Sequence, residues 1–366
     1  MLSEKELHTM WENIPKDFAE YRYTAQILHI YFEKKPEYII KFLNFAKRAK
    51  ITLDPLFSGN RDSKNYTAGK TGYNEGQRNL VVLLLHKLID QQFTKAKPQA
   101  KPSYDANIGA PGAGKTYLLT KKFAINVLEG KFAENAITVG PDLVVMDQIP
   151  DFVNACKLPL GPERTERMQE AYLLWRDASN FIANFMLCMA VTEHLNIVHD
   201  STLTAEAVAA FLKAIAQPDF YDAEFHYNMR ANLLLVDKTS RLQALEYRAK
   251  QKGGFASITL EDADKKGPAL YARLVDDSYT AFQELKIYIR KPGYHNDNGE
   301  DVLIAALNEK ANKIQLLPER EQYLSTVRSY AFSEKLNTEI LEKTLNTIYA
   351  WNTPTITTKI KTKPRL

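Results

Sequence analysis

The spacing of hydrophobic residues changes from segment to segment along this 366-residue chain, and the changes predict alternating strands and helices. Short apolar runs that end in polar residues predict strands at 104–108, 136–139, 196–199, 232–236 and 280–290. Apolar residues at helical spacing predict helices between them, at 115–128, 163–195, 205–216 and 240–250. Strands that alternate with helices pair in parallel, so the expected fold class is α/β, a parallel sheet flanked by helices.

Both ends of the chain are predicted to be helical. Residues 1–93 show helical spacing on either side of a polar, glycine-bearing loop at 52–76, and they carry no chemical motif. The simpler interpretation is a helical cap on the rest of the protein, and the alternative is a partner-binding module. Residues 293–351 are predicted to be a C-terminal helical region, and 352–366 a basic, flexible tail.

The middle of the chain is predicted to be a core at 105–292, reached through a proline- and lysine-rich connector at 94–104. The composition is that of a soluble globular protein, with 45% hydrophobic and 25% charged residues. A net charge of +4 is too small to indicate nucleic acid as a partner. Two cysteines exclude a disulfide scaffold and a cysteine-built zinc site. With no signal segment and no apolar stretch of membrane-spanning length, a cytoplasmic location is expected.

A glycine-rich run directly after the first predicted strand carries the strongest motif. It fits G-x-x-x-x-G-K-[ST], the phosphate-binding P-loop, and reads Gly109, Ala110, Pro111, Gly112, Ala113, Gly114, Lys115, Thr116. Lys115 would reach the β- and γ-phosphates of a nucleotide, Thr116 would hold Mg²⁺, and the following helix adds the positive end of its dipole. The core is therefore predicted to be of the P-loop NTPase type; the alternative is a glycine-rich turn without a ligand. Asp105 and Asn107 make the preceding strand unusually polar for a buried parallel sheet.

Polar residues also follow the other predicted strands, where ligands bind in open α/β sheets. Asp142 could take a proton from a hydroxyl that attacks the γ-phosphate; the alternative is a helix N-cap. Asp200 and Thr202 could bind Mg²⁺ through water or hold a substrate hydroxyl, with capping again the alternative. His199 is expected to be a packed histidine, and Asp237 a turn or cap residue.

Two arginines of the helix at 240–250 are candidates for stabilising phosphate charge. Arg241 and Arg248 are seven residues apart, so both lie near one face of that helix. The alternative for each is a surface cation on an amphipathic helix. Lys252 stands beside Gly253-Gly254 in a basic loop at 251–257 that could form a mobile lid.

In this order, the motifs resemble those of the zeta-toxin-like P-loop kinases. The resemblance covers roughly residues 80–260 and is carried by the P-loop, Val-Gly-Pro-Asp-Leu at 139–143, Ile-Pro-Asp-Phe at 149–152, Ile-Val-His-Asp-Ser-Thr at 197–202, and the strand at 233–236 that leads to Arg248. It implies a kinase that uses Mg²⁺ and ATP or GTP to phosphorylate a sugar nucleotide such as UDP-N-acetylglucosamine. It also implies an inhibitory antitoxin as a partner in many members, and export into host cells in some.

The resemblance also implies roles for individual residues. Lys115 matches the family's phosphate-binding lysine, Thr116 its magnesium ligand and Asp142 its general base. Asp200 and Thr202 match the residues that bind the substrate. Arg248 matches an arginine that stabilises the transition state, with Arg241 as an alternative alignment. One departure stands out, because the family usually has a second lid arginine where this chain has Lys252. A lysine is a point charge without the bidentate fork of arginine, so the lid could serve a different substrate or a slower reaction.

Three other functions stay open beside the small-molecule kinase. An NTP hydrolase or switch usually has an apolar strand ending in Asp-Glu or Asp-x-x-Gly, and neither follows the predicted strands. A nucleic-acid-end kinase would use the basic connector and tail, but the core has no dense patch of arginine and aromatic residues. A nucleotide-binding module without catalysis would follow if the lid departure is disabling.

Overall fold

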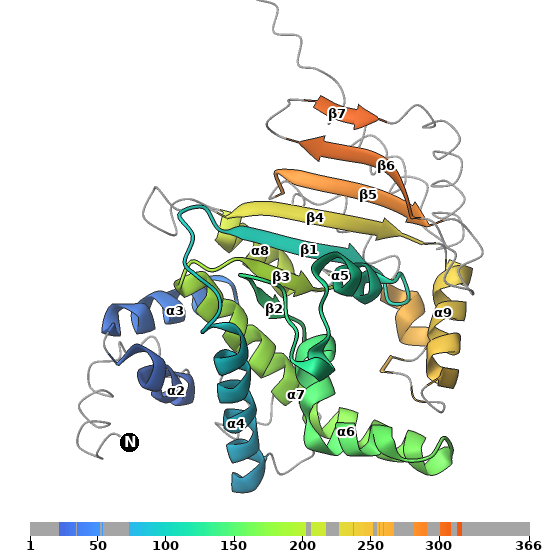
Figure 1. Cartoon of the computed structure of the whole chain (residues 1–366), viewed down its shortest axis with the longest axis horizontal. Helices are drawn as coiled ribbons and strands as arrows, with labels where there is room; N and C mark the ends of the chain where they lie inside the picture. The colour runs from blue at the N-terminus through green and yellow to red at the C-terminus, as the bar shows by residue number, and fades with distance from the viewer. Residues whose placement is uncertain are drawn as a thin grey trace, which may run out of the picture.

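A twisted sheet runs through the centre of the molecule (Figure 1). The computed structural model describes residues 22–33, 35–51, 53, 73–202, 206–216, 227–236, 238–251, 255, 257–258, 260–266, 282–290, 301–308 and 313–316. Within these residues the sheet has seven strands in the order β2-β3-β1-β4-β5-β6-β7. In chain order they are β1 Ser103–Gly109, β2 Ile137–Val139, β3 Ile197–Asp200, β4 Asn228–Leu235, β5 Glu284–Arg290, β6 Asp301–Asn308 and β7 Lys313–Leu316.

The sheet confirms the predicted α/β class. Every pairing from β2 through β3, β1 and β4 to β5 is parallel. The two outer strands, β6 and β7, continue the sheet in antiparallel pairing. The prediction of helix from 301 onward is therefore wrong for 301–308 and 313–316, while 317–351 lie outside the described residues. A short apolar run such as Val302–Leu307 fits a buried strand as well as a helix, and here pairing with β5 decides.

Helices cover both faces of the sheet (Figure 1). Their bounds are α2 Arg22–Phe32, α3 Pro36–Arg48, α4 Glu75–Gln92, α5 Lys115–Phe123, α6 Pro150–Lys157, α7 Pro162–Thr192, α8 Glu206–Ala216 and α9 Lys238–Gln251. Local signals explain where several of them begin and end. Asn74 and Gln77 form a reciprocal capping box at the start of α4. The helix α5 is shorter than predicted, because Ala124 adopts a left-handed conformation, with φ of 51°, and ends it.

The long helix α7 is the centre of the hydrophobic core. Phe185 of α7 packs against Phe42 of α3 with ring centroids 5.1 Å apart, and Trp175 of α7 stacks on Tyr73, just before α4, at 5.4 Å. The indole Nε1 of Trp175 also donates a hydrogen bond of 2.8 Å to Asp151 of α6. The described N-terminal helices therefore share one hydrophobic core with the helices and strands of the sheet domain.

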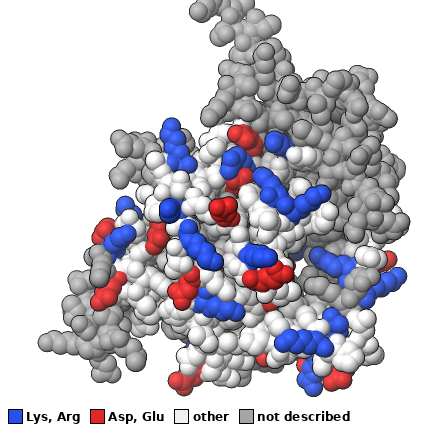
Figure 2. Space-filling model, viewed as in Figure 1, with Lys and Arg blue, Asp and Glu red and all other residues white. Residues whose placement is uncertain are grey.

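Charges of both signs are mixed on the face of the molecule shown in Figure 2, where lysine and arginine alternate with aspartate and glutamate. This distribution agrees with the small net charge of +4. Among the described helices, none combines the length and the apolar character needed to cross a membrane.

The packing of α7 on α3 predicts a large stability effect. Phe185→Ala removes a fully buried ring, so we expect the free energy of unfolding in urea to fall by about 3–5 kcal/mol. Leu173→Ala on the same helix is the control, because Leu173 is 46% exposed, and its cost should stay below about 1 kcal/mol. Equal losses in the two variants would contradict the placement of Phe185 in the core.

Candidate active site

The P-loop connects the end of β1 to the start of α5. Gly112 and Gly114 both have φ of 84°, a left-handed conformation that strongly favours glycine. Gly112 also lies against the main chain of Arg241, and a Cβ added to it would sit only 2.4 Å from that residue's carbonyl oxygen. Gly114 is the N-cap of α5, so the loop leads directly into the helix N-terminus. The motif's glycines thus allow both the turn and the close contact with α9.

The polar residues of β1, unexpected in a buried parallel strand, hold the loop and the sheet together. Asn107 donates a hydrogen bond of 3.1 Å to the carbonyl oxygen of Lys115 and accepts one of 2.9 Å from Asn232 of β4. Asp105 forms an ion pair of 2.5 Å with Arg230, also of β4. Buried polar groups are tolerated when they are paired in this way. The polarity of the strand is therefore part of the support beneath the P-loop.

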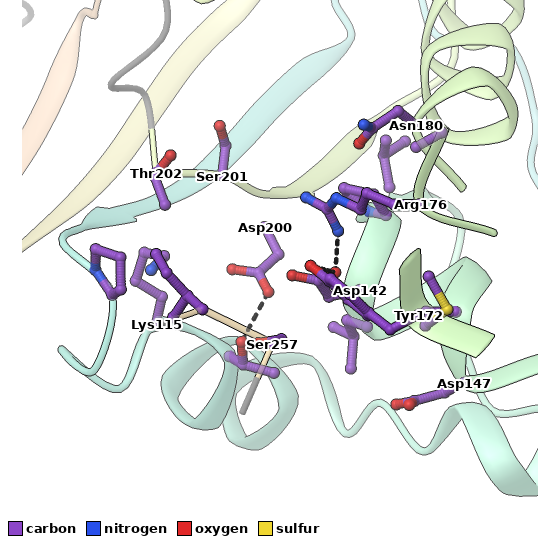
Figure 3. Close-up of a pocket in the computed structure, with 18 of the residues that line it drawn as sticks. Lys115, Asp142, Asp147, Tyr172, Arg176, Asn180, Asp200, Ser201, Thr202 and Ser257 are labelled. Atoms are coloured by element: carbon purple, nitrogen blue, oxygen red, sulfur yellow. Dashed lines mark hydrogen bonds and ion pairs between the residues drawn. The ribbon is translucent and has the colours of Figure 1, made fainter. Parts of the chain in front are cut away.

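A cavity of about 580 Å³ opens beside the P-loop (Figure 3). Its walls are formed by the P-loop, the chain segments after β2 and β3, the helix α7, and residues 255, 257 and 258. Eight of the site residues proposed from the sequence line this one cavity, namely Pro111, Gly112, Lys115, Thr116, Asp142, Asp200, Thr202 and Arg248. The structure therefore brings together the P-loop and the polar ends of the neighbouring strands.

Thr116 and Asp200 meet at the base of the cavity. The Thr116 hydroxyl donates a hydrogen bond of 2.7 Å to Oδ2 of Asp200. The other carboxylate oxygen, Oδ1, is buried and has no hydrogen-bond partner among the described residues. A hydroxyl and a carboxylate beside a P-loop are the protein ligands that Mg²⁺ uses in this class of site. The unpartnered buried oxygen fits such an ion, because a cation would compensate its charge.

Lys115 and Asp200 influence each other through charge. Burial lowers the pKa of Lys115, while the negative charges of Asp200 and Asp142 act in the opposite direction. Burial raises the pKa of Asp200, and the positive charge of Lys115 opposes that shift. Removal from water thus disfavours the charge on both groups. An anionic phosphate beside Lys115 and a cation beside Asp200 would stabilise the charged forms.

Asp142 is the second residue of a short π-helical turn, Pro141–Val145. The N-cap position itself belongs to Gly140, so the alternative of Asp142 as an N-cap does not describe the structure. Its carboxylate instead forms an ion pair with Arg176 of α7 (Figure 3). The hydroxyl of Tyr172 donates to the same carboxylate at 3.4 Å.

The sequence interpretation missed the wall formed by α7. Four polar residues that line the cavity lie four positions apart on this helix, and they are Tyr172, Arg176, Asn180 and Asn184. Residues at that spacing share one helix face. The signal was present in the sequence as a polar residue at every fourth position from 172 to 184, in the part of the helix where apolar residues become frequent. Beside it, Phe255 packs edge-to-face on Phe152 and Tyr172, at 5.6 and 5.7 Å, and gives the cavity an aromatic side.

Arg241 is placed differently from its sequence prediction, His199 is packed against aromatic rings as expected, and two candidates lie outside the described residues. Arg241 is buried and does not line the cavity, because its guanidinium donates to the carbonyl oxygens of Pro111 and Ala263, at 3.1 and 3.3 Å. His199 lines the cavity, and its Nδ1 lies 2.7 Å from the Tyr104 hydroxyl. Burial lowers the pKa of His199 to about 4. Lys252 and Asp237 lie outside the described residues.

Comparisons with known proteins give similarity in fold only. No family model and no curated protein matches the chain. A structure from the PezAT chromosomal toxin–antitoxin system of Streptococcus pneumoniae is 13% identical with a TM-score of 0.43, covering 76% of this chain and 96% of its own. The AvrRxo1-ORF1:AvrRxo1-ORF2 complex with ATP is 14% identical with a TM-score of 0.46, covering 78% and 89%. Similarity at this level says nothing of activity, which has to be judged from the cavity.

The close contact at Gly112 predicts strain in a variant. Gly112→Ala places a methyl group against the Arg241 carbonyl in a left-handed conformation, so we expect the free energy of unfolding to fall by about 1–3 kcal/mol. Gly76→Ala in α4 is the control, because its Cβ would meet the nearest atom at an ordinary 3.5 Å. That variant should be neutral or stabilised by up to about 1 kcal/mol. Chemical unfolding measures both, and a neutral Gly112→Ala would contradict the described loop.

Proposed function

We propose that this chain is a Mg²⁺-dependent phosphotransferase that moves the γ-phosphate of ATP or GTP to a hydroxyl group of a small molecule. The observation that carries the proposal is the shared cavity. Lys115 and Thr116 of the P-loop and the carboxylate of Asp142 line the same space of about 580 Å³. A phosphate-binding loop alone would indicate only nucleotide binding, whereas a carboxylate in the same space supplies a base for an attacking hydroxyl.

The proposed reaction uses residues from three walls of the cavity. The acceptor hydroxyl lies between Asp142 and the γ-phosphate, and its oxygen forms a bond to phosphorus while the hydroxyl proton passes to Asp142. The bond from the γ-phosphorus to the bridging oxygen breaks, and its electron pair leaves with the nucleoside diphosphate. Lys115 and Arg248 stabilise negative charge on the phosphates during the transfer.

Thr116 and Asp200 are the residues that would hold Mg²⁺. An ion held by these two residues would neutralise negative charge on the nucleotide phosphates. Thr116 already donates its hydroxyl hydrogen to Asp200, and this hydrogen bond orients both side chains toward the same place. Thr202, after β3, lines the same cavity and would contact the acceptor.

The acceptor class comes from the sequence resemblance, which implies a sugar nucleotide such as UDP-N-acetylglucosamine. The aromatic side formed by Phe152, Tyr172 and Phe255 could stack on a base or sugar ring of such an acceptor. An inhibitory antitoxin or other protein partner is part of the same proposal. The AvrRxo1-ORF1 structures were solved as complexes with AvrRxo1-ORF2, which is a property of those proteins.

The general base is tested by Asp142→Asn. The purified protein is incubated with Mg-ATP or Mg-GTP and a panel of UDP-sugars, and mass spectrometry detects a product heavier by one phosphoryl group. We expect the variant to lose roughly 10²-fold or more in rate, because general-base catalysis supplies an effect of that size. Its nucleotide affinity should stay close to that of the native protein, whereas Lys115→Ala should lose both binding and transfer.

Glu170→Gln is the matched control, because Glu170 is also a carboxylate paired with an arginine of α7, at the exposed surface. It should keep the native rate. Transfer by Asp142→Asn at the native rate would show that Asp142 is not the base. Steady release of γ-phosphate without any acceptor, and no phosphorylated sugar, would indicate a hydrolase instead.

A further inference from the structure

Two side chains of α7 hold the carboxylate of Asp142 in this structure. Arg176 forms an ion pair with it, and the Tyr172 hydroxyl donates at 3.4 Å. Both contacts are to the same oxygen, Oδ1, whose two lone pairs they occupy. The guanidinium carbon of Arg176 also lies 5.4 Å from the centre of the Tyr172 ring, which keeps it over that ring.

The position of Arg176 constrains what can bind beside Asp142. A hydroxyl that gives its proton to Asp142 has to come within about 2.6–3.2 Å of the carboxylate. The groups next to that hydroxyl then meet the Arg176 guanidinium, which stands at the same carboxylate (Figure 3). A neutral neighbour would offer this permanent cation only uncharged acceptors in place of water, whereas a phosphate accepts two of its hydrogen bonds in parallel and carries the opposite charge.

The ion pair is open to exchange from the cavity. The side chains of Arg176 and Asp142 keep 28% and 55% of their surface exposed although they are paired. An exposed ion pair contributes little, so an incoming anion can displace it. Among the described residues that line the cavity, three further cations are present: Lys115 in the P-loop, Arg248 on α9 and Lys266. Arg176 is the cation that touches Asp142.

We infer that Arg176 selects acceptors that carry a phosphate group close to the reacting hydroxyl, and that this phosphate takes the guanidinium away from Asp142. The inference rests on the proposed function and names the acceptor class of the same site. Binding of the correct acceptor frees Oδ1 of Asp142 to receive the hydroxyl proton. Water and neutral hydroxyl compounds leave the ion pair in place, so they react slowly.

The test measures binding without turnover. The full chain is saturated with Mg²⁺ and a non-hydrolysable ATP analogue, so that the P-loop is filled. It is then titrated calorimetrically with inorganic phosphate, UDP-N-acetylglucosamine and neutral N-acetylglucosamine. We expect a phosphate-bearing probe to bind the native protein and to bind Arg176→Met at least roughly tenfold more weakly. Asp142→Asn should bind it roughly threefold or more tightly, because the carboxylate no longer competes for the guanidinium.

Arg167→Met is the matched control, since Arg167 pairs with Glu170 on the exposed surface of the same helix. Its binding should equal that of the native protein. Arg176→Lys keeps the positive charge but loses the bidentate geometry of the guanidinium. If Arg176→Met does not fold, the binding measured for Arg176→Lys and Asp142→Asn tests the inference instead. The inference is overturned if neither phosphate-bearing probe binds in a way that depends on Arg176, or if Asp142→Asn weakens binding.

These outcomes separate the inference from the proposed function. If binding depends on Arg176 but ATP and GTP give no phosphorylated product, the proposed phosphotransferase activity is wrong and the inference about Arg176 stands. If the native protein and Arg176→Lys both form product equally well from neutral and phosphate-bearing acceptors, the inference about Arg176 is wrong and the proposed phosphotransferase activity stands.

Discussion

The parallel pairing of β1 with β3 determines where the chemistry of this molecule lies. In that pairing Asn107 stands opposite Asp200, so the end of β3 comes beside the start of α5. The Thr116 hydroxyl can then reach the Asp200 carboxylate, and β2, on the far side of β3, brings Asp142 to the same edge. A slip of one residue would turn the side chain of Asp200 to the opposite face of the sheet. The candidate site is thus a product of strand register.

The helix α7 contributes both to the hydrophobic core and to the wall of the cavity. Most of its 31 residues are buried in the core, where Phe185 contacts the N-terminal helix α3 and Trp175 contacts Tyr73, just before α4. One polar stripe, from Tyr172 to Asn184, lines the cavity instead. Because the polar and the buried residues belong to one continuous helix, packing of its buried face in the core determines where Arg176 lies relative to Asp142.

Much of the fold and part of the site can be predicted from sequence, because their signals are local. The P-loop is a contiguous motif, and Asp142, Asp200, Thr202 and Arg248 were found from their positions after strands or on one helix face. The partners of the polar strand were not predictable, since Asn107 and Asn232 are 125 positions apart in the sequence. The outer strands β6 and β7 were missed because a short apolar run is compatible with either a helix or a strand, and the pairing of each with the strand before it decides the outcome. Arg241 and Arg248 share a helix face but stand about two turns apart, so one packs beneath the P-loop and the other reaches the cavity.

The buried Arg241 has a consequence for how the chain tolerates change. Its two hydrogen bonds from Nη1 go to main-chain oxygens, those of Pro111 and Ala263. Every residue type has such an oxygen, so these two hydrogen bonds do not depend on which side chain is present at positions 111 and 263. The demand falls instead on Arg241 itself and on Gly112, where the approach of the two backbones leaves no space for a side chain. In related sequences, these contacts should therefore restrict the donor and the glycine, whereas positions 111 and 263 are restricted by their burial and not by the hydrogen bonds.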